Sequence, residues 1–179
     1  MPGYVERLAR IAKEIEVAKE SIAVLLTLIV ALVLGCNNSN GSGSGVRSVV
    51  TVADDDPEMV AAIKDAKGTL GFFEKNWKTM KSDGYSLKFA LPTTEGGLEH
   101  IWFSPTKIQD DKIVGVCANE PGKIAGLKLG DTRTVSRNDI SDWMIVVGTQ
   151  CYGGYTIRVL AKRDPAAAPP LSFLDPPKN

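Results

Sequence analysis

Residues 56–80 read DPEMVAAIKDAKGTLGFFEKNWKTM and residues 85–91 read YSLKFAL, and these two stretches decide the fold. In the first, apolar residues recur at steps of three and four, the spacing of one face of an α-helix. In the second, apolar and polar residues alternate, which is typical of a half-buried strand. The sequence therefore predicts a core-facing helix followed by a strand. The helical stripe consists of Val60, Ile63, Ala66, Leu70, Phe73, Trp77 and Met80.

The start of the helix is marked by Asp54, Asp55, Asp56, Pro57 and Glu58. An aspartate can accept hydrogen bonds from the free N–H groups of a first turn, and proline is favoured at the first helical position. A calcium loop is the rival interpretation of so many carboxylates. The EF-hand pattern of alternating ligands, central glycine and final glutamate does not follow, so a helix start is predicted.

After residue 91 the chain alternates between short apolar stretches and turn residues. Strands are predicted at 98–103, 112–118, 132–135, 143–147 and 155–161, with glycine, asparagine or aspartate in most of the connections. One amphipathic helix packed on a curled antiparallel sheet of about six short strands belongs to the α+β class. A Leu-Gly-Asp turn at 129–131 before a short strand suggests an SH3-like barrel as the form of that curl.

The N-terminal region carries an apolar run of 13 residues, IAVLLTLIVALVL at 22–34. Extended by Gly35 and Cys36, a helix of that length covers about 22 Å, whereas a bilayer core is about 30 Å thick. The run therefore suits the apolar region of a signal peptide. It ends in VLGC at 33–36, which resembles the lipobox of bacterial lipoproteins. In such proteins the cysteine carries the lipid, so Cys36 is the predicted lipidation site.

The domain boundaries follow from changes in composition. Residues 1–36 are predicted to be a signal peptide, and 37–48, which begin NNSNGSGSG, a flexible tether. Residues 49–163 form the folded domain, and the Pro-rich residues 164–179 a disordered tail. Residues 1–16 are too long and too mixed in charge for the start of a signal peptide, so translation from Val17 is the alternative start.

Charge indicates no partner. The 21 basic and 21 acidic residues balance and are interspersed, so the basic face that nucleic-acid binding requires is not expected. The predicted lipid places the protein at a membrane of the bacterial cell envelope, with its domain facing the periplasm or the exterior. The expected partner is an envelope protein, a peptide or a cell-wall component.

Four segments in the domain resemble a known bacterial family, the domain of unknown function DUF2314. The helix start at 56–59 is also similar to the start of that domain, and the likeness covers roughly residues 54–161. What it implies is limited to small bacterial proteins, some of them exported, because the family brings no established activity. The segments are EHIW at 99–102, ANEP at 118–121, DISDWM at 139–144 and GGYTIRVL at 153–160.

His100, the only histidine, is the first chemical candidate. On a strand it would lie on one face with Trp102, while Ile101 and Phe103 point to the opposite face. It could act as a general base or metal ligand with Asp142 or Glu120, or simply pack against an indole ring. Common zinc sites need more ligands than one histidine, so no metal site and no cofactor is predicted.

Other polar and aromatic residues could line a recognition surface. Asn119 and Glu120 stand in a predicted loop, where recognition residues are common. Trp102, Trp143 and Tyr155 could line a groove or fill the core, and core is favoured for two of the three. The predicted binding residues are Glu99, His100, Trp102, Asn119, Glu120, Asp142 and Trp143.

Two cysteines remain once Cys36 is assigned to lipid. Export would expose Cys117 and Cys151 to an oxidising compartment, where a disulfide between them can form. The alternative is two small buried thiols, which pack like other apolar side chains. The sequence leaves both open.

The residues contain no phosphate-binding glycine loop, nucleophile elbow or paired carboxylates. The predicted function is therefore a non-catalytic binding module of the envelope. The alternatives are an enzyme of the hydrolase type that uses His100 with nearby acids, and a protective lipoprotein of the immunity type.

Overall fold

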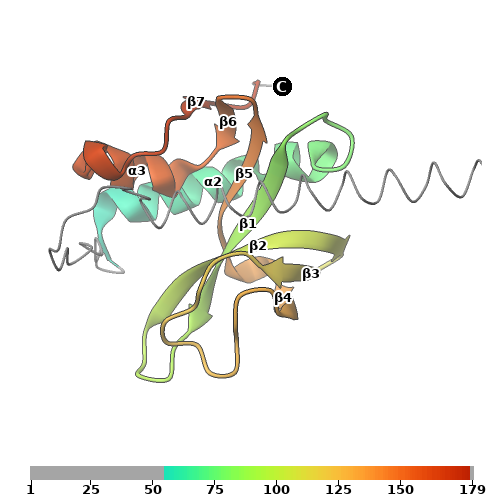
Figure 1. Cartoon of the computed structure of the whole chain (residues 1–179), viewed down its shortest axis with the longest axis vertical. Coiled ribbons are helices and arrows are strands. Elements are labelled where there is room, and N and C mark those ends of the chain that lie inside the picture. The colour runs from blue at the N-terminus through green and yellow to red at the C-terminus, as the bar shows by residue number, and fades with distance from the viewer. Residues whose placement is uncertain (1–54, 178–179) are drawn as a thin grey trace, which may run out of the picture.

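The computed structural model describes residues 55–177, which form two α-helices and a seven-stranded sheet (Figure 1). The α+β class predicted from the sequence is confirmed. Two short 3-10 turns, η1 (Arg137–Asp139) and η2 (Pro165–Ala167), complete the structure. The helices and strands are α2 (Pro57–Asn76), β1 (Gly84–Pro92), β2 (Leu98–Gln109), β3 (Lys112–Cys117), β4 (Thr132–Ser136), β5 (Ile140–Val147), β6 (Gln150–Gly153), α3 (Tyr155–Arg163) and β7 (Ser172–Leu174).

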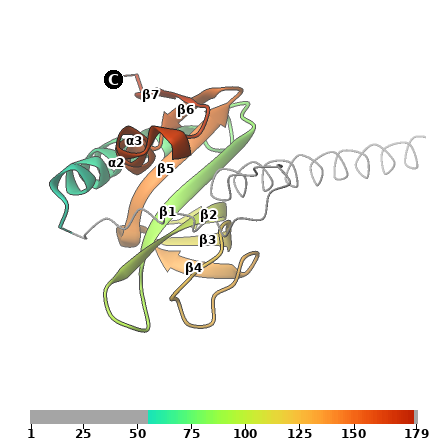
Figure 2. The same cartoon turned by 60° about the vertical axis from the view of Figure 1, so that its left-hand side comes forward.

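Helix α2 begins where the sequence predicts. The Asp56 carboxylate accepts a hydrogen bond from Met59 N at 3.0 Å, and Pro57 is the first helical residue. Arg163, from the end of α3, donates to the same carboxylate at 2.7 Å and lowers the pKa of Asp56. This ion pair joins the two helices, which lie side by side at one end of the molecule (Figure 2).

The strands follow the order β4-β3-β2-β1-β5-β6-β7, and every neighbouring pair is antiparallel except β6 and β7. The predicted SH3-like barrel is wrong, because this sheet does not close on itself. After β4 the chain passes through η1 into β5, which pairs with β1 and leaves β4 as an edge strand. At the opposite side β6 and β7 extend the sheet beyond β5.

The two faces of the sheet bury different residues. On one face Leu87, Phe89 and Trp143 pack with α2, and Trp143 Nε1 donates a hydrogen bond to Ala66 O at 3.0 Å. Trp102 and Met144 lie in a second, smaller cluster with Cys151. The predicted alternation along 98–103 is confirmed, since Ile101 and Phe103 belong to the first cluster and Trp102 to the second.

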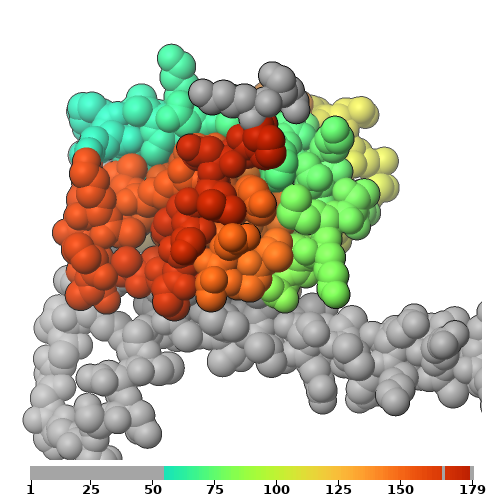
Figure 3. Space-filling model, turned by 90° about the horizontal axis from the view of Figure 1, so that it is seen from above, coloured from blue at the N-terminus to red at the C-terminus, as the bar shows by residue number. Residues whose placement is uncertain are grey.

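The region after β5 corrects two predictions. Residues 155–161 form helix α3 and not a strand, because Gly153 and Gly154, with φ of 79° and 66°, turn the chain out of β6. The C-terminal tail, which the sequence predicts to be disordered, is ordered over residues 164–177. Ser172 N donates to Thr149 O at 2.7 Å, and β7 adds a parallel edge strand to β6. Figure 3 shows this C-terminal segment packed on the surface of the domain.

The predicted signal peptide, Cys36 and the tether lie outside the described residues and stay predictions. Within 55–177, neither helix is long and apolar enough to cross a membrane.

Candidate functional site

A buried polar cluster lies between β1 and β5, beneath the start of α3. Lys88 and Asp142 face each other in the strand register, and their exposed fractions are 9% and 0%. Lys88 Nζ donates to Thr156 Oγ1 at 3.1 Å, and this hydroxyl donates to Asp142 Oδ2 at 2.6 Å. The ammonium also lies 5.4 Å from the centre of the Trp102 ring. A threonine hydroxyl thus links two opposite charges inside the protein.

Asp142 also provides the cap that α3 lacks. Gly154 precedes the helix and has no side chain to accept hydrogen bonds from the first turn. Instead, Asp142 Oδ1 accepts from Tyr155 N at 3.1 Å, and Oδ2 accepts from Thr156 N at 2.8 Å. A carboxylate at this position satisfies free N–H groups and opposes the positive end of the helix dipole. The Asp142 carboxylate on β5 therefore caps the N-terminus of a helix that starts 13 residues later.

Burial acts on both ionisable groups of the cluster. Loss of solvent raises the pKa of Asp142, and the opposing influences are the charge of Lys88 and the hydrogen bonds from Thr156 and Trp143. Loss of solvent lowers the pKa of Lys88, and the charge of Asp142 opposes that change. Each group therefore depends on the other to remain charged in the interior.

His100 lies beside this cluster and contacts a serine. Its Nδ1 is 2.8 Å from Ser141 Oγ, which in turn donates to Lys88 O at 3.4 Å. Which of these two atoms donates to the other depends on the tautomer of the ring. Ser141 is also only 2% exposed, which leaves its hydroxyl no access to a substrate.

The other predicted site residues do not gather around His100. The Glu99 carboxylate accepts hydrogen bonds from Gly122 N and Lys123 N at 2.7 and 2.8 Å. Asn119 Oδ1 accepts from Trp102 N at 2.7 Å, so both side chains hold the loop 118–131 against β2. Glu120 is exposed in that loop, and Trp143 lies in the core on the opposite face of the sheet. Only His100, Trp102 and Asp142 are brought together.

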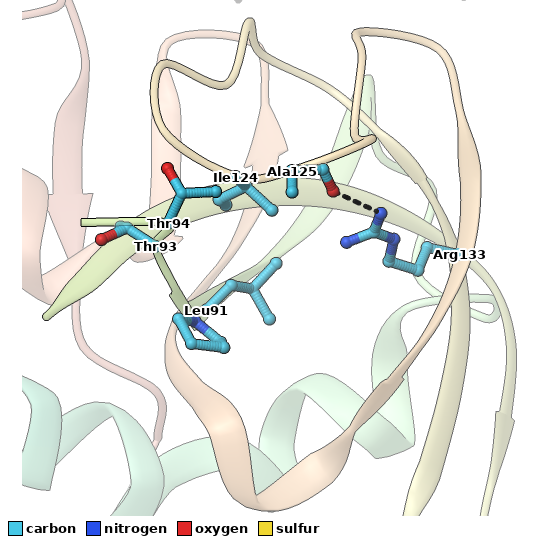
Figure 4. A pocket seen from close by; sticks show the side chains of 7 residues that line it. Leu91, Thr93, Thr94, Ile124, Ala125 and Arg133 are labelled. Carbon is cyan, nitrogen blue, oxygen red and sulfur yellow. Dashed lines mark hydrogen bonds between the residues drawn. The ribbon is translucent and has the colours of Figure 1, made fainter. Parts of the chain in front are cut away.

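A separate groove of about 330 Å³ opens between the β1–β2 turn, the loop 118–131 and β4 (Figure 4). Arg133 stands at one side of it, and its Nη2 donates to Ala125 O at 3.4 Å and to Gly126 O at 3.2 Å. Across the opening, Thr94 N donates to Lys123 O at 3.0 Å and fixes the turn to the loop. The lining residues are Leu91, Pro92, Thr93, Thr94, Ile124, Ala125 and Arg133.

Comparison with known proteins gives a family for this arrangement. Residues 56–166, from the cap of α2 to η2, match the model of a family described as uncharacterized proteins conserved in bacteria, DUF2314. The chain belongs to the DUF2314 family. Its match therefore includes both the buried cluster and the groove.

Two known proteins are similar in sequence to this chain. The uncharacterized protein YegJ of Escherichia coli is 32% identical over 110 residues, which are 62% of this chain and 71% of YegJ. A putative ankyrin repeat protein of Neisseria meningitidis is 39% identical over 62 residues, 35% of this chain and 24% of that protein. The chain thus spans about a quarter of the second relative. No solved structure matches this DUF2314 chain.

Sequence reasoning missed three members of the cluster: Lys88, Ser141 and Thr156. Lys88 occupies a polar position in the alternating stretch 85–91, where solvent exposure is the usual expectation. Its burial depends on α3, which the sequence presented as a strand. Once β1 and β5 are known to pair, the opposite charges of Lys88 and Asp142 could have indicated the contact.

Of the two alternatives for the cysteines of this DUF2314 domain, the disulfide is not formed. Cys117 and Cys151 are free and buried, the first in the core beneath α2 and the second in the smaller cluster. They stand on β3 and β6, with three strands between them in the sheet. Strands repeat at about 4.8 Å, so the separation far exceeds the roughly 7 Å limit for Cα atoms of a disulfide. The alternative of two small buried thiols is the one observed.

Both thiols are expected to resist alkylation in the folded protein. Burial raises the pKa of Cys117, and it raises the pKa of Cys151 to about 12. Below pH 9, Cys151 then has about a thousandfold less thiolate than an ordinary cysteine, and thiolate is the reactive form. Mass spectrometry after iodoacetamide treatment at pH 8 should show both thiols unmodified in buffer and modified in urea. Rapid modification of Cys151 in buffer would contradict this burial.

Proposed function

We propose that this protein is a lipid-anchored component of the bacterial cell envelope whose DUF2314 domain binds another protein without catalysing a reaction. The lipobox-like VLGC at 33–36 and the polar tether support the anchor. A tether of that composition lets a folded domain reach partners away from the membrane surface.

The observation that carries the non-catalytic part is the engagement of Asp142. It was one of the acid candidates, yet its carboxylate accepts four hydrogen bonds from the protein and is fully buried. In the same region, His100 Nδ1 lies 2.8 Å from the hydroxyl of the buried Ser141. These groups stabilise the fold and do not meet at an open surface.

The relative with ankyrin repeats adds support for a binding role. Its name describes repeats of a kind that stack into extended binding surfaces. A segment similar to 62 residues of this chain therefore occurs in a protein named as a putative ankyrin repeat protein. Binding of a protein partner is the corresponding proposal for the present chain.

The anchor is tested by metabolic labelling with an alkyne-bearing fatty acid in cells that produce the full chain. The wild type should be labelled and should sediment with membranes, and Cys36→Ala should lose the label. Cys117→Ala is the matched control and should keep both properties. An unlabelled wild-type protein would overturn the lipid anchor.

Partner binding is tested by cross-linking the full chain in intact cells, followed by affinity purification and mass spectrometry. The expected result is an envelope protein captured in near-stoichiometric amount by the wild type and equally by His100→Gln. Loss of capture in His100→Gln with unchanged thermal stability would show that the ring takes part in partner binding. Absence of any enriched envelope protein would overturn the binding proposal.

A further inference from the structure

The sheet is left open between β4 and the end of β1. Strand β5 pairs with β1 only as far as Phe89, which lies opposite Ile140. Beyond this point, residues 90–92 of β1 pair with β2 on one side only. Strand β4 likewise pairs with β3 alone among the strands of residues 55–177. The groove of Figure 4 lies between these two, with Leu91 and Arg133 among its lining residues.

The groove combines an apolar floor with one cation. Leu91 and Ile124 supply the apolar part, while the hydroxyls of Thr93 and Thr94 donate to the carbonyls of Gly96 and Lys123. The recorded partners of the Arg133 guanidinium are two neutral main-chain carbonyls, and no ion pair of the described residues includes it. Its remaining N–H donors suit a carboxylate, which arginine binds with two parallel hydrogen bonds.

The edge beside this cation suits an extended peptide. Residues 132–136 read TRTVS, rich in β-branched residues and free of the proline or lysine that often guards an edge. Val135 points to the buried side, and Arg133, two residues earlier, lies on the same face. A strand added to this edge would therefore bring every second side chain next to Arg133 and the apolar floor.

We infer that β4 and the groove bind an extended segment of a partner protein by strand addition, with an acidic side chain on Arg133. A second side chain of the segment, apolar and two residues away, lies over Leu91 and Ile124. Main-chain hydrogen bonds to β4 supply affinity, and the two side chains supply selectivity. This inference rests on the proposed binding function and names the chemistry of its partner.

The test begins with a phage-displayed library of random dodecapeptides selected on the immobilised full chain. Enriched sequences should contain aspartate or glutamate two residues from a large apolar residue. The best peptide is then synthesised, and its Kd is measured by fluorescence anisotropy against the wild type and two variants. Arg133→Gln should weaken binding about tenfold or more, the usual scale for a charge-assisted contact. Arg137→Gln, the same change at a residue directly after β4 that does not line the groove, should stay within twofold.

Three further measurements keep the outcome unambiguous. Replacing the acid of the peptide by its amide should reproduce the loss without altering the protein, which covers the case of a misfolded Arg133→Gln. Alternate N–H groups of an added strand point toward β4, so N-methylation of that set should abolish binding, and N-methylation of the other set should not. Light scattering should show a monomer, since a dimer broken by Arg133→Gln would mean that a second copy occupies β4.

Several results would overturn the inference. These are a library without enrichment, enriched peptides without acidic residues, or equal losses in Arg133→Gln and Arg137→Gln. If an envelope partner is nevertheless captured in cells, it binds elsewhere and the proposed function stands. If no partner is captured while acidic peptides bind at Arg133, the groove is supported and the envelope role fails.

Discussion

Asp142→Ala is expected to lower the free energy of unfolding by about 3–5 kcal/mol, the scale measured when one partner of a buried ion pair is removed. The substitution deletes the acceptor of four hydrogen bonds and leaves the first-turn N–H groups of α3 without a partner. It also leaves the charge of Lys88 buried without its counter-charge. Since the free energy of unfolding of a domain of this size is about 5–15 kcal/mol, we expect the variant to be only marginally stable.

Urea denaturation of purified protein, followed by circular dichroism, measures this loss. Asp83→Ala is the matched control, because the Asp83 carboxylate also accepts a main-chain hydrogen bond, from Gly148 N at 2.6 Å, but is exposed. It should cost a small fraction of the Asp142 change. Equal losses in the two variants would show that burial and capping give Asp142 no special role. If Asp142→Ala does not fold, Asp142→Asn, which keeps one acceptor oxygen, provides the measurable variant.

A double-mutant cycle separates the cap from the ion pair. Lys88→Met should cost less than Asp142→Ala, because it leaves all four hydrogen bonds to the carboxylate intact. The combined Lys88→Met and Asp142→Asn variant should lose less than the two single losses added together, since each single change leaves one buried charge unpaired and the combined variant leaves none. Strict additivity would mean that Lys88 and Asp142 do not interact through Thr156.

The cluster also explains why the C-terminal part of the fold was the least predictable. In residues 155–161 the apolar Tyr155, Ile157, Val159 and Ala161 alternate with other residues, which favours a strand. The same residues form a helix because a carboxylate from β5 caps it, a contact that depends on tertiary structure. Local sequence carries no sign of such a cap. The start of helix α2, whose Asp56 cap is local, was predicted correctly, while the helix ends at Asn76 and not after Met80.

The candidate site, like the fold, could be predicted from the sequence only in part. His100, Trp102 and Asp142 could be named from the sequence because they are unusual residues on predicted strands or, for Asp142, directly before one. Their roles could not be assigned, since Ser141 and Lys88 reach them only through the pairing of β1 with β5. Arg133 was overlooked for a related reason. A single arginine on a short strand is ordinary until the loop 118–131 folds beside it and forms a groove.

Gly153→Ala is the second substitution expected to have a large effect, a loss of about 4 kcal/mol or more through overpacking and backbone strain combined. Gly153 has a φ of 79°, which side-chain-bearing residues rarely adopt. A Cβ at this position would overlap the carbonyl oxygen of Trp143 and would stand 2.7 Å from an atom of its indole ring. Neither neighbour can move freely, because Gly154 N donates to that carbonyl and the ring lies in the core beneath α2.

Gly148→Ala is the matched control for this change. Gly148 also has a positive φ, of 59°, but a Cβ there would meet nothing within 4 Å. It should cost only the conformational penalty of about 1–2 kcal/mol for a left-handed residue. The difference between the two variants in urea denaturation therefore isolates the close approach of Gly153 to Trp143. Equal losses would show that backbone conformation alone accounts for the glycine. A larger loss at Gly153 would mean that the turn from β6 into α3 requires the backbone to pass directly over the core tryptophan.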